Sequence, residues 1–115
     1  MDRIVKAFFN SAAGLSHAMR YELAVRQEVL VLLIAIPVSF FLTDNCWKRL
    51  ALVGVLLIVL MVELLNTAIE ALSDHVTPDA HPHIRIVKDL GSAAVFMALT
   101  LAGLTWLVAL VERLV

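Results

Sequence analysis

Four polar side chains recur at helical spacing inside an otherwise apolar stretch of the sequence. They are Glu63, Asn66, Glu70 and Asp74, with Thr67 beside them. At about 100° per residue they fall on one narrow stripe of a helix. A carboxylate in the apolar part of a membrane helix costs roughly 2.5–3.5 kcal/mol on insertion scales, so such groups usually face a bundle interior, a cavity or a bound ion. This acidic stripe is therefore the first candidate for a functional site.

The spacing within the acidic stripe predicts different roles for its two glutamates. Glu63 and Glu70 are two helical turns apart, about 10 Å along the axis, so one magnesium ion with ligands at about 2.0–2.1 Å is not expected to bind both directly. Glu63, deeper in the apolar sequence, suits a general base, and Glu70, nearer to water, suits a metal ligand. The alternative is that Glu63 and Asn66 only join helices through hydrogen bonds. One amide would suffice to join two helices, so the presence of three carboxylates beside it favours a catalytic or metal-binding role.

The composition indicates an all-α integral membrane protein. The chain has 115 residues, of which 62% are hydrophobic, and its mean hydropathy is +0.94. Soluble domains contain about 45–50% apolar residues. A chain of this length forms one domain over 1–115, too small to enclose a large site alone. We therefore expect an oligomer.

Charge and cysteine content exclude other classes of protein. The net charge is -1 and no basic cluster is present, which argues against a nucleic-acid partner. The single Cys46 cannot form an internal disulfide. No cleavable signal peptide is apparent at the start, so the apolar spans are expected to act as the targeting signal.

Four helices are predicted from the hydrophobic pattern. An amphipathic helix over about 3–20 has the periodicity of a helix that lies on the membrane surface. Three apolar spans follow at about 23–43, 49–72 and 88–112. The second span begins after a short polar turn and carries the acidic stripe at its far end.

The basic residues predict the orientation in the membrane. Six lie on the N-terminal side (Arg3, Lys6, Arg20, Arg26, Arg85 and Lys88) and three on the other (Lys48, Arg49 and Arg113). By the positive-inside rule the N-terminus is expected in the cytoplasm and the C-terminus in the periplasm. The acidic stripe then opens toward the compartment that holds nucleotides and magnesium.

Carboxylates and cations gather at this one membrane boundary. Carboxylates that can bind magnesium, together with cations that can bind phosphate, are the elements of phosphoryl transfer. Neither a P-loop nor a kinase glycine-rich loop is present, so a nucleotide site would be of another kind. A small ion translocator and a non-catalytic membrane subunit are the further alternatives. The first would need polar residues through the full membrane depth, and the second would leave the stripe without a purpose. His81 and His83, without cysteine partners, are weak evidence for zinc.

Three motifs then resemble one protein family closely. They are Glu63-Leu-Leu-Asn-Thr-Ala-Ile-Glu70-Ala, Lys88-Asp89-x-Gly91-Ser92-Ala-Ala-Val95 and Glu22-x-x-x-Arg26-Gln27-Glu28. Together they resemble the prokaryotic integral-membrane diacylglycerol kinases over nearly the whole chain. The same family includes undecaprenol kinases, which stay an alternative, and Gly91-Ser92 is similar to the diacylglycerol branch.

The resemblance implies a homotrimer of three-span subunits in the bacterial inner membrane, each with a surface helix, and active sites shared between subunits. It implies ATP- and Mg²⁺-dependent phosphorylation of the primary hydroxyl of 1,2-diacylglycerol to phosphatidate at the cytoplasmic face. By matching positions, Glu63 is the catalytic base, and Glu22 and Glu70 are magnesium ligands. An ordinary ion pair between Glu22 and Arg26, four residues apart, is the alternative for Glu22.

The resemblance also assigns the remaining contacts. The expected ATP contacts are Arg3, Asn10, Glu22, Glu70, Asp79, His81, Lys88 and Asp89. The expected lipid contacts are Ser11, Arg26, Arg49, Glu63, Ser92 and Trp106, and the supporting residues are Asn66, Asp74, Glu28 and Gly91. Asn10 departs from the family, whose members have an aromatic residue there, and the loop over 77–82 differs in composition.

Overall fold

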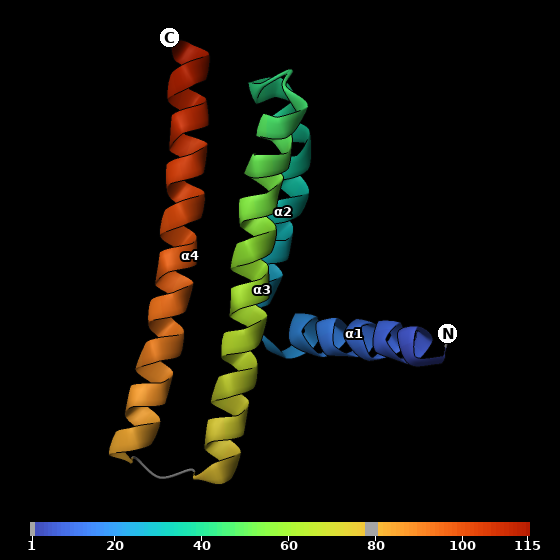
Figure 1. The fold of residues 1–115 in the computed structure, drawn as a ribbon, viewed down its shortest axis with the longest axis vertical. Coiled ribbons are helices and arrows are strands. Elements are labelled where there is room, and N and C mark those ends of the chain that lie inside the picture. Colours follow the sequence, from blue (N-terminus) through green and yellow to red (C-terminus); the bar gives the residue numbers. More distant parts are fainter. Residues whose placement is uncertain (1, 78–80) are drawn as a thin grey trace.

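The computed structural model describes residues 2–77 and 81–115, and the described residues form four helices (Figure 1). These helices are α1 (Asp2–Tyr21), α2 (Leu23–Leu42), α3 (Cys46–Val76) and α4 (Pro82–Leu114). The last three are long and apolar enough to cross a membrane. The prediction of an all-helical chain with three candidate spans is therefore confirmed.

Helix α3 is the centre of the bundle. It packs against α2 on one side and α4 on the other, whereas α2 and α4 touch each other little. Figure 1 shows the three helices running side by side, with the α2–α3 turn and the C-terminus at the same end. The acidic stripe lies in the half of α3 toward the other end of the bundle.

The three bundle helices differ in length, and the difference decides where polar residues lie. Helix α2 has 20 residues, enough to cross a hydrocarbon core of about 30 Å. Helices α3 and α4 have 31 and 33 residues. At 1.5 Å per residue α3 is about 46 Å long, so roughly 15 Å of it extends beyond such a core. The expected spans 49–72 and 88–112 lie within these two longer helices.

Helix α1 lies across the bundle rather than along it, and its N-terminal half projects away from α3 and α4 (Figure 1). Its one buried residue is Ala18, near its C-terminal end, which packs with Val25 of α2 and Leu60 of α3. The Arg26 guanidinium donates hydrogen bonds to the carbonyl oxygens of Met19 and Arg20, at 3.2 and 2.9 Å. These bonds satisfy carbonyls at the end of α1 that lack helical partners.

Small side chains allow α3 and α4 to approach closely in the middle of the bundle. Val55 and Val59 of α3 pack with Ala98 and Ala102 of α4, and all four are buried. Nearer the α2–α3 turn, the indole N–H of Trp106 donates a 3.0 Å hydrogen bond to the backbone carbonyl of Leu52. Small apolar residues at the contact are typical of helix packing in membranes.

The α2–α3 turn satisfies many of its own polar groups. The Asn45 side-chain oxygen accepts from the N–H groups of Trp47 and Lys48, at 2.9 and 3.2 Å, which caps α3. The Thr43 hydroxyl accepts from the Asn45 N–H at 3.1 Å. Arg49 donates to the Thr43 carbonyl at 3.0 Å and lies 3.8 Å from the Asp44 carboxylate.

The start of α4 is also capped by a side chain. His81 Nδ1 accepts from the backbone N–H of His83 at 3.1 Å, and Pro82 occupies the first turn, where a missing N–H costs nothing. The two imidazole rings stack 5.4 Å apart. In the structure this pair of histidines begins a helix.

Candidate active site at the acidic stripe

The acidic stripe begins at the level where α1 joins α2. Val25 packs with Leu60, so Glu63, one turn further along α3, lies level with Glu22 at the start of α2. Glu70 lies about 10 Å further along the axis. The stripe therefore runs from the membrane boundary defined by α2 into the part of α3 that extends beyond it.

Asn66 is the buried centre of the stripe. Its side chain is 8% exposed, and its amide nitrogen donates to a Glu70 carboxylate oxygen at 3.1 Å. Its amide oxygen is buried and accepts no hydrogen bond from the described residues. On α4, Gly91 faces this amide: a Cβ added there would overlap the Asn66 oxygen and lie 3.2 Å from its Cγ. Gly91, one of the expected supporting residues, therefore allows α4 to approach Asn66 closely, and Asn66 orients Glu70.

Glu63 lies among other carboxylates. It is half-buried, and Glu22, Glu28 and Glu70 are close enough for their charges to interact with it. Glu28 contributes a buried carboxylate oxygen that has no hydrogen-bond partner among the described residues. Two helices, α2 with its N-cap Glu22 and α3, thus bring three other glutamates within electrostatic range of Glu63, with polar groups left for a ligand to contact.

Two ion pairs lie beyond these glutamates. The Lys88 ammonium of α4 lies 2.7 Å from the Asp74 carboxylate of α3, which joins the stripe to the opposite helix. Arg85 and Asp89 pair at 3.3 Å within α4, and both are largely exposed. The expected ATP contacts Lys88 and Asp89 therefore lie at the same end of the bundle as Glu70.

The expected magnesium ligands differ in how they are held. Glu22 caps the start of α2 by position, and its side chain makes no capping hydrogen bond. Glu70 is exposed and is oriented by Asn66. Within residues 2–77 and 81–115, no three His, Cys, Asp or Glu side chains form a cluster able to hold a metal.

Several expected contacts are not joined to the stripe within one chain. Arg3, Asn10 and Ser11 are exposed on α1, and the Ser11 hydroxyl bonds back to the Ala7 carbonyl at 2.8 Å. Asp79 lies outside the described residues. Ser92 is exposed on α4, next to Gly91. Arg26 bonds to the end of α1 and forms no ion pair with Glu22 in the described part of the chain.

Two expected lipid contacts lie at the opposite end of the bundle. Arg49 is bonded to the α2–α3 turn and stacks over the Phe40 ring at 4.3 Å. Trp106 is held by the Leu52 carbonyl and lines an apolar groove of about 500 Å³ between α2, α3 and α4. Eleven residues separate Leu52 from Glu63, about 16 Å along α3. The expected lipid residues thus form two groups.

The structure adds relations that the sequence analysis did not identify. The bond from Asn66 to Glu70 has the i,i+4 spacing of a helix pair, so the sequence carried a signal for it. The Lys88–Asp74 pair and the buried oxygen of Glu28 depend on how α2 and α4 face α3, for which the sequence carries no local signal.

Comparison with known proteins agrees with the resemblance. The model of the family "Prokaryotic diacylglycerol kinase" matches residues 9–110. The chain is 45% identical over 106 residues to a diacylglycerol kinase of Pseudomonas aeruginosa, covering 92% of this chain and 86% of that protein. It is 38% identical over 108 residues to the diacylglycerol kinase of Escherichia coli K12, with 94% and 88% covered. For the Haemophilus influenzae diacylglycerol kinase the values are 36% over 96 residues, with 84% and 81% covered.

Proposed function

Because this chain belongs to the prokaryotic diacylglycerol kinase family, we propose that it transfers the γ-phosphoryl group of ATP directly to the primary hydroxyl of 1,2-diacylglycerol. The products are phosphatidate and ADP. The observation that carries the proposal is the position of Glu63, half-buried at the membrane boundary with Glu22, Glu28 and Glu70 around it. At this boundary the hydroxyl of a lipid can approach Glu63 from the membrane, and the phosphates of ATP can approach it from water.

Glu63 acts as the general base in this proposal. Its carboxylate takes the proton of the lipid hydroxyl while the hydroxyl oxygen forms a bond to the γ-phosphorus. The bond from the γ-phosphorus to the oxygen that bridges the β- and γ-phosphates breaks, and ADP leaves with that oxygen's electron pair. The proton then passes from Glu63 to water, which restores the carboxylate.

The carboxylates of Glu22 and Glu70 fit magnesium. Mg²⁺ takes hard oxygen ligands, usually one or two carboxylates together with phosphate oxygens and water. Glu22 and Glu70 supply two carboxylates on different helical segments, and Asn66 holds Glu70 in a fixed orientation. When bound, the ion neutralises the charge of the transferred phosphoryl group. Glu63 remains available for the proton.

Lys88 and the neighbouring residues suit the phosphates of ATP. Lys88 is paired with Asp74, and both side chains are partly exposed, so a phosphate can compete for the ammonium group. Asp89, His81 and Asp79 complete the proposed ATP contacts from α4 and the preceding segment, and Arg3 and Asn10 add contacts from α1. Ser11, Arg26 and Ser92 are proposed as contacts of the lipid. At the far end, Trp106 would meet acyl chains rather than the reacting head group, since it lines an apolar groove.

The proposed active unit is a homotrimer whose sites combine residues of neighbouring subunits. In one chain, α1 projects away from α3 and α4, and Arg3 and Ser11 make no hydrogen bond to these helices in the described structure (Figure 1). A neighbouring subunit can bring its own α1 to the stripe. The proposal places the trimer in the bacterial inner membrane, with the N-terminus in the cytoplasm and the C-terminus in the periplasm.

The direct test is transfer of label from γ-labelled ATP in mixed micelles. Dioleoylglycerol and undecaprenol are offered separately, each with and without magnesium. Magnesium-dependent label on dioleoylglycerol is the expected result. Label mainly on undecaprenol would keep the mechanism and replace the substrate, and label on neither lipid would overturn the proposed kinase activity.

A further inference from the structure

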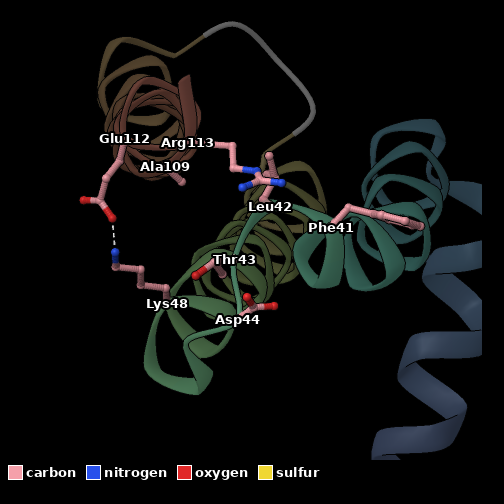
Figure 2. A pocket seen from close by; sticks show the side chains of 8 residues that line it. All are labelled: Phe41, Leu42, Thr43, Asp44, Lys48, Ala109, Glu112 and Arg113. Atoms are coloured by element: carbon pink, nitrogen blue, oxygen red, sulfur yellow. Dashed lines mark hydrogen bonds and ion pairs between the residues drawn. The ribbon is translucent and has the colours of Figure 1, made fainter. Parts of the chain in front are cut away.

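The end of the bundle opposite the acidic stripe has a second polar pocket. It lies between the α2–α3 turn and the last turns of α4, as Figure 2 shows, and its volume is about 250 Å³. The residues around it that carry the argument are Phe41, Thr43, Asp44, Lys48, Glu112 and Arg113. The proposed kinase reaction uses none of them.

The charges around this pocket are incompletely paired. Lys48 of α3 forms an ion pair with Glu112 of α4, and Asp44 lies 3.8 Å from Arg49. Arg113 takes part in no ion pair among the described residues, and in Figure 2 it extends away from the Lys48–Glu112 pair. The pocket therefore combines an unpaired guanidinium and the Thr43 hydroxyl with two carboxylates that each already face one cation.

The position of the pocket fits a membrane surface. Helices α2 and α4 end beside it, and α3 begins there. Since these three helices are long and apolar enough to cross a membrane, the pocket lies at the boundary opposite the acidic stripe. Phe41 and Trp47 are 82% and 78% exposed at this level. Tryptophan is enriched in the region where lipid head groups meet the acyl chains.

We propose that this pocket binds the head group of phosphatidylethanolamine from the leaflet opposite the acidic stripe. The phosphate binds the Arg113 guanidinium, whose planar donors match phosphate oxygens, with the Thr43 hydroxyl as a second donor. The ammonium group of the same head group binds the carboxylates of Glu112 and Asp44. The ammonium competes with Lys48 for Glu112 and with Arg49 for Asp44. A purely anionic head group has no cation to place there, so the mixed charge favours a zwitterion.

The test measures how much lipid the purified full-length chain retains. Equimolar phosphatidylethanolamine and phosphatidylglycerol are added in detergent, and native mass spectrometry identifies the bound lipid. The chain should retain phosphatidylethanolamine preferentially. Arg113→Gln should weaken this binding about tenfold, the effect of one charge-assisted hydrogen bond. Arg20→Gln, which removes an exposed cation from α1, is the matched control and should bind like the unchanged chain.

A second variant tests the assignment of the ammonium group. Glu112→Gln removes one carboxylate and frees Lys48, so the preference should shift toward phosphatidylglycerol. Binding unchanged by Arg113→Gln, or an equal loss in Arg20→Gln, would overturn the proposal. If Arg113→Gln changed the mass of the oligomer and left lipid retention unchanged, the proposal would also be overturned. Arg113 would then contact a second copy of the chain rather than a lipid. Arg113→Lys, which keeps the charge but not the fork of donors, should bind with intermediate affinity.

Discussion

Glu63 is the residue on which the proposed chemistry depends most directly. Glu63→Gln keeps the size and polarity of the side chain but removes the proton acceptor. We expect the turnover of diacylglycerol to fall by at least about 10²- to 10⁴-fold, the usual contribution of a positioned base. Label transfer from γ-labelled ATP measures this, with circular dichroism as the check on helix content.

The matched control for this change is Glu112→Gln, the same substitution on an exposed glutamate at the opposite end of the bundle. Its turnover should be that of the unchanged chain. Normal turnover by Glu63→Gln would instead assign Glu63 to helix packing.

Glu70 has a different expected phenotype because it is assigned to the metal. In Glu70→Gln the proposed ligand loses its charge, while Asn66 keeps a hydrogen-bond partner at the same place. We expect the magnesium concentration at half-maximal rate to rise about tenfold or more, since losses of ligand-shell groups are of this order. A magnesium titration of the kinase rate measures the shift, and an unchanged titration would remove Glu70 from the metal site.

At the scale of elements, the contact between α3 and α4 at Gly91 holds the stripe in place. Gly91→Ala puts a methyl group where the Asn66 amide oxygen lies. Relieving that overlap should cost about 1–3 kcal/mol of stability and should lower turnover, because Asn66 orients Glu70. Unfolding in sodium dodecyl sulfate and the label-transfer rate together measure both effects.

Gly103→Ala is the matched control on the same helix, since no atom lies within 4 Å of a Cβ added at Gly103. It should be neutral or stabilising by up to about 1 kcal/mol, the helix preference for alanine. If Gly91→Ala and Gly103→Ala have the same stability toward sodium dodecyl sulfate, the contact between Gly91 and Asn66 does not position the site.

Trp106 also belongs to the packing of α3 and α4. Trp106→Phe removes the donor of the bond to the Leu52 carbonyl but retains an aromatic ring in the apolar groove. We expect a loss of about 0.5–1.5 kcal/mol in stability, the net value of one hydrogen bond, with the KM for diacylglycerol little changed. A raised KM at unchanged stability would show instead that the indole N–H contacts the head group of diacylglycerol.

The elements themselves were largely predictable from the sequence, because each span is a long apolar run that only a helix can carry through lipid. The expected spans 49–72 and 88–112 stop short of the polar ends of α3 and α4, because hydropathy shows where the apolar sequence ends rather than where the helix ends. Within the site, helical spacing placed Glu63, Asn66 and Glu70 on one face. The pairing of Lys88 with Asp74 could not be predicted from the sequence, because it depends on the rotation of α4 about its own axis.

At the scale of the whole molecule, the proposed trimer predicts complementation between inactive chains. Arg3→Ala and Glu63→Gln each disable one component of the site. If α1 of one subunit completes the site of another, random mixing places both intact residues together about one time in four. Mixed trimers reconstituted from equal amounts should therefore recover about a quarter of the activity of the unchanged trimer. Activity no higher than the two variants measured separately would place Arg3 and Glu63 in the same subunit.

The capped turn between α2 and α3 also has a consequence for biosynthesis. If α2 and α3 enter the membrane as a helical hairpin, Asp44, Lys48 and Arg49 must pass through the hydrocarbon core. The turn already joins Arg49 to Asp44 and to the Thr43 carbonyl, and Asn45 satisfies two N–H groups of α3. Each polar group that is hydrogen-bonded within the turn lowers the free-energy cost of moving the turn from water into lipid. The same hydrogen bonds that begin α3 in the finished protein thus ease the passage of its charged tip during insertion.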